Sequence, residues 1–129
     1  EWIQNEQWSA GMGSSIQIGI TYVLRHYPEA ESVMVLVCDQ PFISSVLLEE
    51  MLLVKMQTGK GIVACTYNDT VGTPVLFGKI YFEQLAVLNG QQGAKKLVQQ
   101  FAADTAMVAF PLGVVDIDTA EDYEQLNRN

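Results

Sequence analysis

Three acidic residues stand where carboxylates could hold a metal ion. Asp39 directly follows the apolar run 32–38, and Asp116 and Asp118 flank Ile117 near the end of the chain. Carboxylate oxygens suit Mg²⁺, which prefers one or two carboxylates together with substrate phosphates. A turn or helix-capping role is the alternative for each acid. Spacing alone leaves both interpretations open.

A small-residue segment could bind a nucleotide. Gly11-Met12-Gly13-Ser14-Ser15 precedes a helical pattern, so backbone N–H groups and two hydroxyls are available there for an anion or a nucleobase edge. The segment matches neither the Gly-x-x-x-x-Gly-Lys-Ser/Thr phosphate loop nor a dinucleotide fingerprint. Helix capping by Ser14 or Ser15 is the alternative. His26 is the only histidine, so the chain offers no conventional Ser-His-Asp set.

The elements that must position these residues alternate along the chain. Apolar runs predict strands at 32–38, 61–67, 73–77, 106–110 and 114–117, and helical periodicity predicts helices at 16–27, 45–57, 79–88, 93–101 and 120–127. Ser44 or Ser45 is expected to cap the helix at 45–57, which should end near Gly59. This alternation predicts a mainly parallel, layered α/β sheet, with 32–38 covered on both faces. Ligands bind beyond the carboxyl ends of strands in such sheets. Asp39 and the Asp116–Asp118 pair are expected at that edge.

Composition limits the class of protein. The 129 residues fit a single domain, and 49% hydrophobic residues are enough for a core. A net charge of -8 argues against binding to nucleic acid. Cys38 and Cys65 each lie in an apolar run and are expected to be reduced, buried thiols. No apolar run reaches the length of a membrane span, so we expect a cytoplasmic protein without membrane contact.

Five segments in order resemble one family. They are Gly11-Met12-Gly13-Ser14-Ser15-Ile16, Val37-Cys38-Asp39-Gln40-Pro41-Phe42, Gly72-Thr73-Pro74-Val75-Leu76-Phe77, Gly93-Ala94-Lys95 and Asp116-Ile117-Asp118-Thr119-Ala120-Glu121-Asp122. The set resembles the MobA-like NTP transferases, and within them the molybdenum cofactor cytidylyltransferase branch. The resemblance covers nearly the whole chain.

The resemblance implies a Rossmann-like, three-layer fold of the GT-A type. It implies transfer of CMP or GMP from CTP or GTP to the terminal phosphate of molybdopterin, with release of pyrophosphate. Asp39 and Asp118 would be catalytic and would bind Mg²⁺, with Asp116 beside Asp118 as a further metal ligand. Asp39 would also bind the nucleotide. The nucleotide would contact Gly11, Gly13, Ser14 and Ser15, and the acceptor would contact Gly72, Thr73 and Pro74.

One part of the family pattern has no counterpart here. Family members open with a Gly-rich loop followed by Lys, which hold the triphosphate. We therefore expect residues 1–129 to be about the C-terminal two thirds of one nucleotidyltransferase domain that lacks its first β-α unit or units. Such a fragment would be inactive by itself, and its unpaired strand would favour weak self-association. The alternatives are a nucleotidyltransferase for a sugar or alditol phosphate, and a non-enzymatic receiver-like or binding module.

Overall fold

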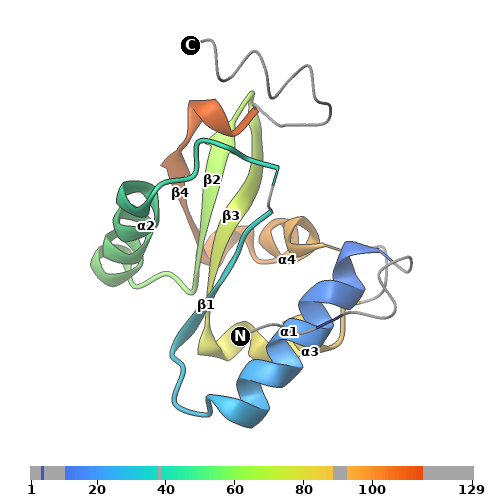
Figure 1. Cartoon of the computed structure of the whole chain (residues 1–129). Helices are drawn as coiled ribbons and strands as arrows, with labels where there is room; N and C mark the ends of the chain where they lie inside the picture. The colour runs from blue at the N-terminus through green and yellow to red at the C-terminus, as the bar shows by residue number, and fades with distance from the viewer. Residues whose placement is uncertain (1–3, 5–10, 38, 89–92, 115–129) are drawn as a thin grey trace.

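The computed structural model describes residues 4, 11–37, 39–88 and 93–114. A four-stranded sheet in the order β1-β3-β2-β4 forms its centre (Figure 1). The strands are β1 (Ser32–Val35), β2 (Ile62–Tyr67), β3 (Thr70–Gly78) and β4 (Thr105–Ala109). The helices are α1 (Met12–His26), α2 (Ser45–Thr58), α3 (Phe82–Ala86) and α4 (Ala94–Gln100), with short 3₁₀ turns η2 (Lys79–Tyr81), η3 (Ala102–Asp104) and η4 (Pro111–Val114).

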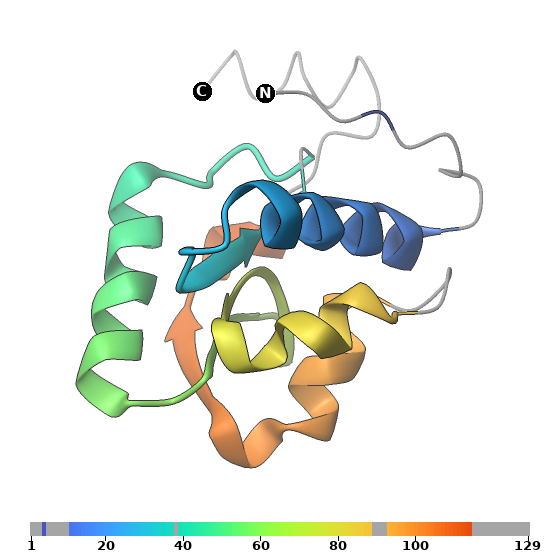
Figure 2. The same cartoon turned by 90° about the horizontal axis from the view of Figure 1, so that it is seen from below.

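The helices cover both faces of the sheet, giving the three layers that the sequence predicts (Figure 2). Side chains alternate across each strand. On one face, Val63 and Cys65 pack with Leu47 and Met51 of α2. On the other face, strand residues pack in a second core with α1, α3 and α4, which contains Ile20, Ile62, Ala64, Val75, Phe77, Leu85, Leu97 and Val98. None of the helices among the described residues has the length and apolar character of a membrane span.

The sheet is mixed, whereas the sequence predicts a mainly parallel one. β2 and β4 are parallel, but β3 runs antiparallel to both β1 and β2, so three strands share one direction and β3 opposes them. The cause is the two-residue turn Asn68-Asp69, whose φ angles of 54° and 57° are left-handed. Asn and Asp tolerate this conformation, and so short a connection can join only antiparallel strands.

β1 differs from the buried strand expected at 32–38. It ends at Val35, and all four of its residues are only half-buried. β1 lies at one end of the strand order, and β3 is its partner among the described residues. Within the described sheet, this continuous apolar run therefore forms a strand at the end of the strand order.

The cap predicted for α2 is confirmed, and the cap predicted for α1 is not. Ser44 caps α2 as expected, accepting a hydrogen bond from the Leu47 backbone N–H at 3.2 Å, and Gly59 ends the helix with a left-handed φ of 70°. The predicted cap of α1 at Ser14 or Ser15 is wrong. α1 begins at Met12, with Gly11 at a φ of 110° that glycine adopts readily. Ser14 lies inside the first turn, where its hydroxyl donates to the Gly11 carbonyl at 2.8 Å.

A polar contact closes the amino edge of the sheet. The Tyr81 hydroxyl and the Gly61 backbone N–H both donate to the Asp104 carboxylate. Burial and this hydrogen bond raise the pKa of Tyr81 to about 12. The hydrogen bonds from Tyr81 and Gly61 lower the pKa of Asp104 below its usual value. Gly61 is needed for this approach, because a Cβ there would collide with both Asp104 and Tyr81.

Replacing this aspartate should reduce stability in a pH-dependent way. Asp104→Asn should lower the free energy of unfolding by about 1–2 kcal/mol at pH 7, since an amide cannot accept both hydrogen bonds as well as a carboxylate. Because the folded-state pKa of Asp104 is lowered, its contribution is present above the unfolded pKa of about 4 and is lost as the pH falls through the folded value. Urea unfolding at pH 7 and pH 3 should therefore show a wild-type advantage that shrinks in acid. A difference that does not change with pH would contradict this role for Asp104.

Candidate active site

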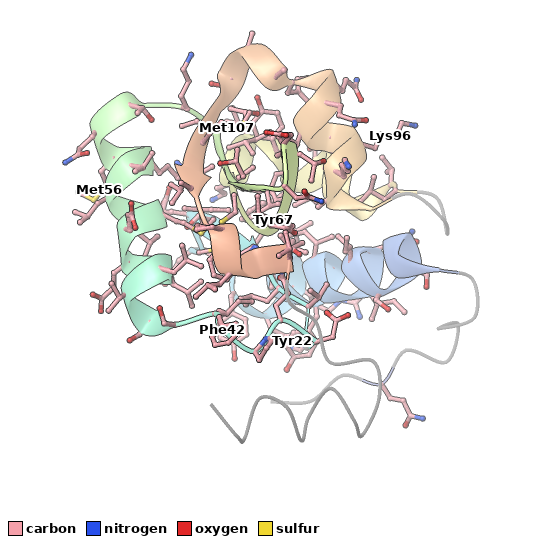
Figure 3. All side chains as sticks on the ribbon, turned by 90° about the horizontal axis from the view of Figure 1, so that it is seen from above. Tyr22, Phe42, Met56, Tyr67, Lys96 and Met107 are labelled. Atoms are coloured by element: carbon pink, nitrogen blue, oxygen red, sulfur yellow. The ribbon has the colours of Figure 1, made fainter. Side chains whose placement is uncertain are left out.

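A polar cavity opens at the carboxyl edge of the sheet. The chain leaves β1, β2 and β4 at this edge and enters β3 there, because β3 runs in the opposite direction. Figure 3 looks onto this side of the molecule, with Tyr67 near the centre of the view. The cavity has a volume of about 420 Å³ and is lined by Val37, Asp39, Gln40, Tyr67, Asn68, Thr70, Thr73, Gly113 and Val114.

Among the described residues, Asp39 is the carboxylate that lines this cavity. It follows β1 through the loop that also contains Gln40, and it is partly exposed. The other lining side chains that carry oxygen or nitrogen are neutral: one amide on Gln40, one on Asn68, and the hydroxyls of Tyr67, Thr70 and Thr73. Oxygen donors of this kind suit a hard divalent cation. The described residues contain no group of three His, Cys, Asp or Glu side chains that could hold a metal ion.

Asp116 and Asp118 lie outside the described residues, as do most of the predicted strand at 114–117 and all of the predicted helix at 120–127. The convergence of these two acids with Asp39 therefore stays a prediction. Val114, the first residue of the predicted strand, instead ends η4 and lines the cavity.

Gln40 ties the loop that carries Asp39 to three other elements. Its side-chain Nε2 lies 3.1 Å from the Thr73 carbonyl, 3.1 Å from the Gly113 carbonyl and 3.3 Å from the Tyr67 hydroxyl. Its Oε1 accepts a hydrogen bond from the Thr73 hydroxyl at 3.0 Å. Gln40 is only 8% exposed, so these contacts satisfy an amide that would otherwise be costly to bury. The network fixes the backbone next to Asp39.

Tyr67 lines the cavity, and its side chain packs against two glycines that leave space for it. A Cβ on Gly72 would collide with the Tyr67 hydroxyl, and a Cβ on Gly113 would collide with its ring. Phe110 packs edge-on against the same ring, with centroids 6.2 Å apart. The glycines thus bring β3 and η4 close to β2 at the site.

The predicted acceptor segment is only partly at the cavity. Thr73 lines it, Gly72 packs against Tyr67, and Pro74 is fully buried in the sheet. Of the three, Thr73 is therefore the residue whose side chain can reach a bound molecule.

The predicted nucleotide segment borders a second, more apolar cavity. This cavity of about 330 Å³ lies between α1 and β1, and Ser15 and Val37 are among its lining residues. Val37 also lines the cavity that contains Asp39, so the two spaces are neighbours. Gly13 and Ser14 are buried at the start of α1, while Ser15 is exposed. Ser15 is the residue of this segment best placed to contact a ligand.

The sequence interpretation missed several of the lining residues. Thr73 lines the cavity and is predicted as an acceptor-binding residue, but the motifs assign no role to Gln40, Tyr67, Asn68 or Thr70. The Asn68-Asp69 pair between two β-rich runs is a hairpin signal that could have placed these residues at the ligand edge.

Comparison with known proteins places this chain in a family. Residues 1–106 match the family model of the MobA-like NTP transferase domain. The chain belongs to this family. The fold, an α/β/α sandwich with the candidate site at the carboxyl edge of its strands, agrees with that membership.

Three of the solved structures similar to this MobA-like domain come from mycobacteria. Rv0371c from Mycobacterium tuberculosis H37Rv is 29% identical, with a TM-score of 0.69, over 92% of this chain. Rv0371c in complex with manganese is also 29% identical, with a TM-score of 0.66 over 89% of the chain. The Rv0371c homolog from Mycobacterium sp. strain JC1 is 27% identical, with a TM-score of 0.68 over 87%. The chain spans 60%, 60% and 55% of these three structures respectively. Comparison with curated proteins gives no significant match.

Proposed function

We propose that this nucleotidyltransferase transfers CMP or GMP from CTP or GTP to the terminal phosphate of molybdopterin and releases pyrophosphate. The observation that carries the proposal is Asp39, which lines a polar cavity at the carboxyl edge of the sheet in a MobA-like domain. The acceptor phosphate is already ionised at neutral pH, so it can attack without a strong general base. This fits a cavity whose described lining contains no histidine.

A divalent cation is the expected cofactor, and we propose Mg²⁺. Asp39 would bind it together with Asp118 and Asp116, and phosphate oxygens would complete the coordination. Manganese in the Rv0371c complex supports a divalent ion in this fold. When bound, the cation would neutralise charge on the α-phosphate during nucleotidyl transfer.

We assign nucleotide binding and acceptor binding to two further segments. Gly11, Gly13, Ser14 and Ser15 would form the nucleotide side, with Ser15 nearest to the ligand. Thr73, supported by Gly72 and Pro74, would form the acceptor side. We further propose a cytoplasmic location, and weak self-association stays a prediction.

Substrate-dependent release of pyrophosphate tests the reaction. The full-length protein should release pyrophosphate from CTP or GTP in the presence of Mg²⁺ when molybdopterin is added. Release that depends instead on a sugar or alditol phosphate would keep the reaction class and replace the acceptor. Absence of nucleotide binding and of release with every acceptor would overturn the proposal.

Base selection should depend on Ser15. Ser15→Ala in the full-length protein should reduce the preference between CTP and GTP by about 2- to 10-fold, since the lost hydroxyl contact is worth ~0.5–1.5 kcal/mol. The ratio of kcat/KM for the two nucleotides measures this effect. Thr21→Ala, on the exposed side of the same helix, is the control and should leave the ratio unchanged. An unchanged ratio in Ser15→Ala would limit the serine to a structural role.

A further inference from the structure

One lysine forms a hydrogen bond with a residue that lines the cavity, and the proposed function gives this lysine no role. The Lys95 ammonium donates to the Thr70 hydroxyl at 3.0 Å. Thr70 begins β3 and lines the same cavity as Asp39. Lys95 lies in the first turn of α4, within the Gly93-Ala94-Lys95 segment. The contact therefore brings a positive charge from α4 to the edge of the candidate site.

Two other described lysines form hydrogen bonds elsewhere. Lys60 donates to the Ala103 carbonyl and Lys79 donates to the Pro28 carbonyl, away from the cavity. Lys96, next to Lys95, is exposed and lies on the outer side of α4 in Figure 3. Among the described basic residues, Lys95 is the one whose hydrogen bond reaches a lining residue of this cavity.

The charge of the chain and of the cavity lining favours such a group at the site. The chain carries a net charge of -8, and the described lining adds Asp39 and no basic side chain. A phosphate monoester entering this cavity would meet a negative potential unless a cation lies beside it. A metal ion at Asp39 would compensate the carboxylate, and a second positive charge would compensate an incoming phosphate.

We propose that Lys95 and Thr70 bind the phosphate of the acceptor substrate. Lysine binds phosphate as a point charge. Because the Thr70 oxygen accepts from Lys95, the threonine can donate its own hydrogen to a phosphate oxygen. This inference rests on the proposed function and assigns Lys95 and Thr70 to the acceptor phosphate, which would lie between Asp39 and Lys95.

Phosphate binding by the chain itself tests the inference without turnover. Inorganic phosphate should shift the amide NMR signals of Thr70 and Thr73 in the wild type. Lys95→Met should weaken this binding about 10-fold or more, the effect of losing one charge-assisted hydrogen bond, and Lys95→Arg should retain it. Lys96→Met is the matched control because it removes the same charge one residue away. Equal weakening in both methionine variants, or no shift at Thr70 in the wild type, would overturn the inference.

Kinetics separate this inference from the proposed function. In the full-length protein, Lys95→Met should raise the KM for the acceptor about 10-fold and leave the KM for the nucleotide near its wild-type value. Phosphate binding through Lys95 in a protein that shows no transfer would keep the phosphate site at Lys95 and Thr70 but remove the proposed reaction and, with it, the acceptor role. Transfer with a normal acceptor KM in Lys95→Met would keep the proposed reaction and overturn the inference.

Discussion

Asp39→Asn should lower the rate of nucleotidyl transfer by about 100-fold or more, the size of effect expected when one group that stabilises transition-state charge is lost. The substitution keeps the shape of the side chain and removes the charge that would hold the cation. The free energy of unfolding should stay the same or rise, since the loop is fixed by Gln40 rather than by the Asp39 carboxylate. Pyrophosphate release and urea unfolding of the full-length protein measure the two quantities.

Asp69→Asn is the matched control for this prediction. Asp69 lies at the same edge of the sheet, is exposed, and does not line the cavity. Asparagine also tolerates its φ of 57°, so the hairpin turn should survive. If Asp39→Asn loses about 1 kcal/mol of stability and keeps its turnover, Asp39 is a turn or capping residue and the metal site is wrong.

Gln40→Glu should destabilise the fold by about 3 kcal/mol at pH 7, because a buried carboxylate would face two carbonyl oxygens where the amide donated to both. The unfavourable contacts raise the pKa of the new carboxyl in the folded state. The destabilisation should therefore be smallest below the unfolded pKa of about 4.3 and grow as the pH rises through the folded value. Urea unfolding between pH 4 and pH 8 would follow this trend.

Gln57→Glu makes the same chemical change on the exposed side of α2. It should alter stability by less than about 0.5 kcal/mol at any of these pH values. A loss in Gln40→Glu no larger than in Gln57→Glu would show that the Gln40 network does not hold the loop.

Some local features of the fold could be predicted from the sequence, and others could not. Ser44 and Gly59 bound α2 as predicted, because a capping hydroxyl and a left-handed glycine act within one helical turn. The direction of β3 was missed, since it depends on the two turn residues Asn68 and Asp69. The cap of α1 was missed as well, because serine and glycine can both begin a helix and Gly11 supplies the backbone conformation.

The site could be predicted only in part. A strand followed by Asp39 indicates a carboxylate at the ligand edge of an α/β sheet, and the structure places Asp39 there. The residues around it come from distant parts of the chain. Gln40 is bonded to Thr73 and Gly113, which lie 33 and 73 residues away. Local patterns carry no information about such pairs, so the network and the Lys95–Thr70 contact became visible only in the fold.

Paramagnetic broadening by Mn²⁺ is the most direct test of a metal-nucleotide site at the carboxyl edge. In the presence of CTP, Mn²⁺ should broaden the amide NMR signals of Asp39, Gln40 and Thr73 at substoichiometric concentration. The signals of Gly61 and Asp104, at the opposite edge of the sheet, should stay sharp, and Asp39→Asn should abolish the selective effect. Broadening centred on Gly61 and Asp104, or a selective effect that survives in Asp39→Asn, would contradict the account.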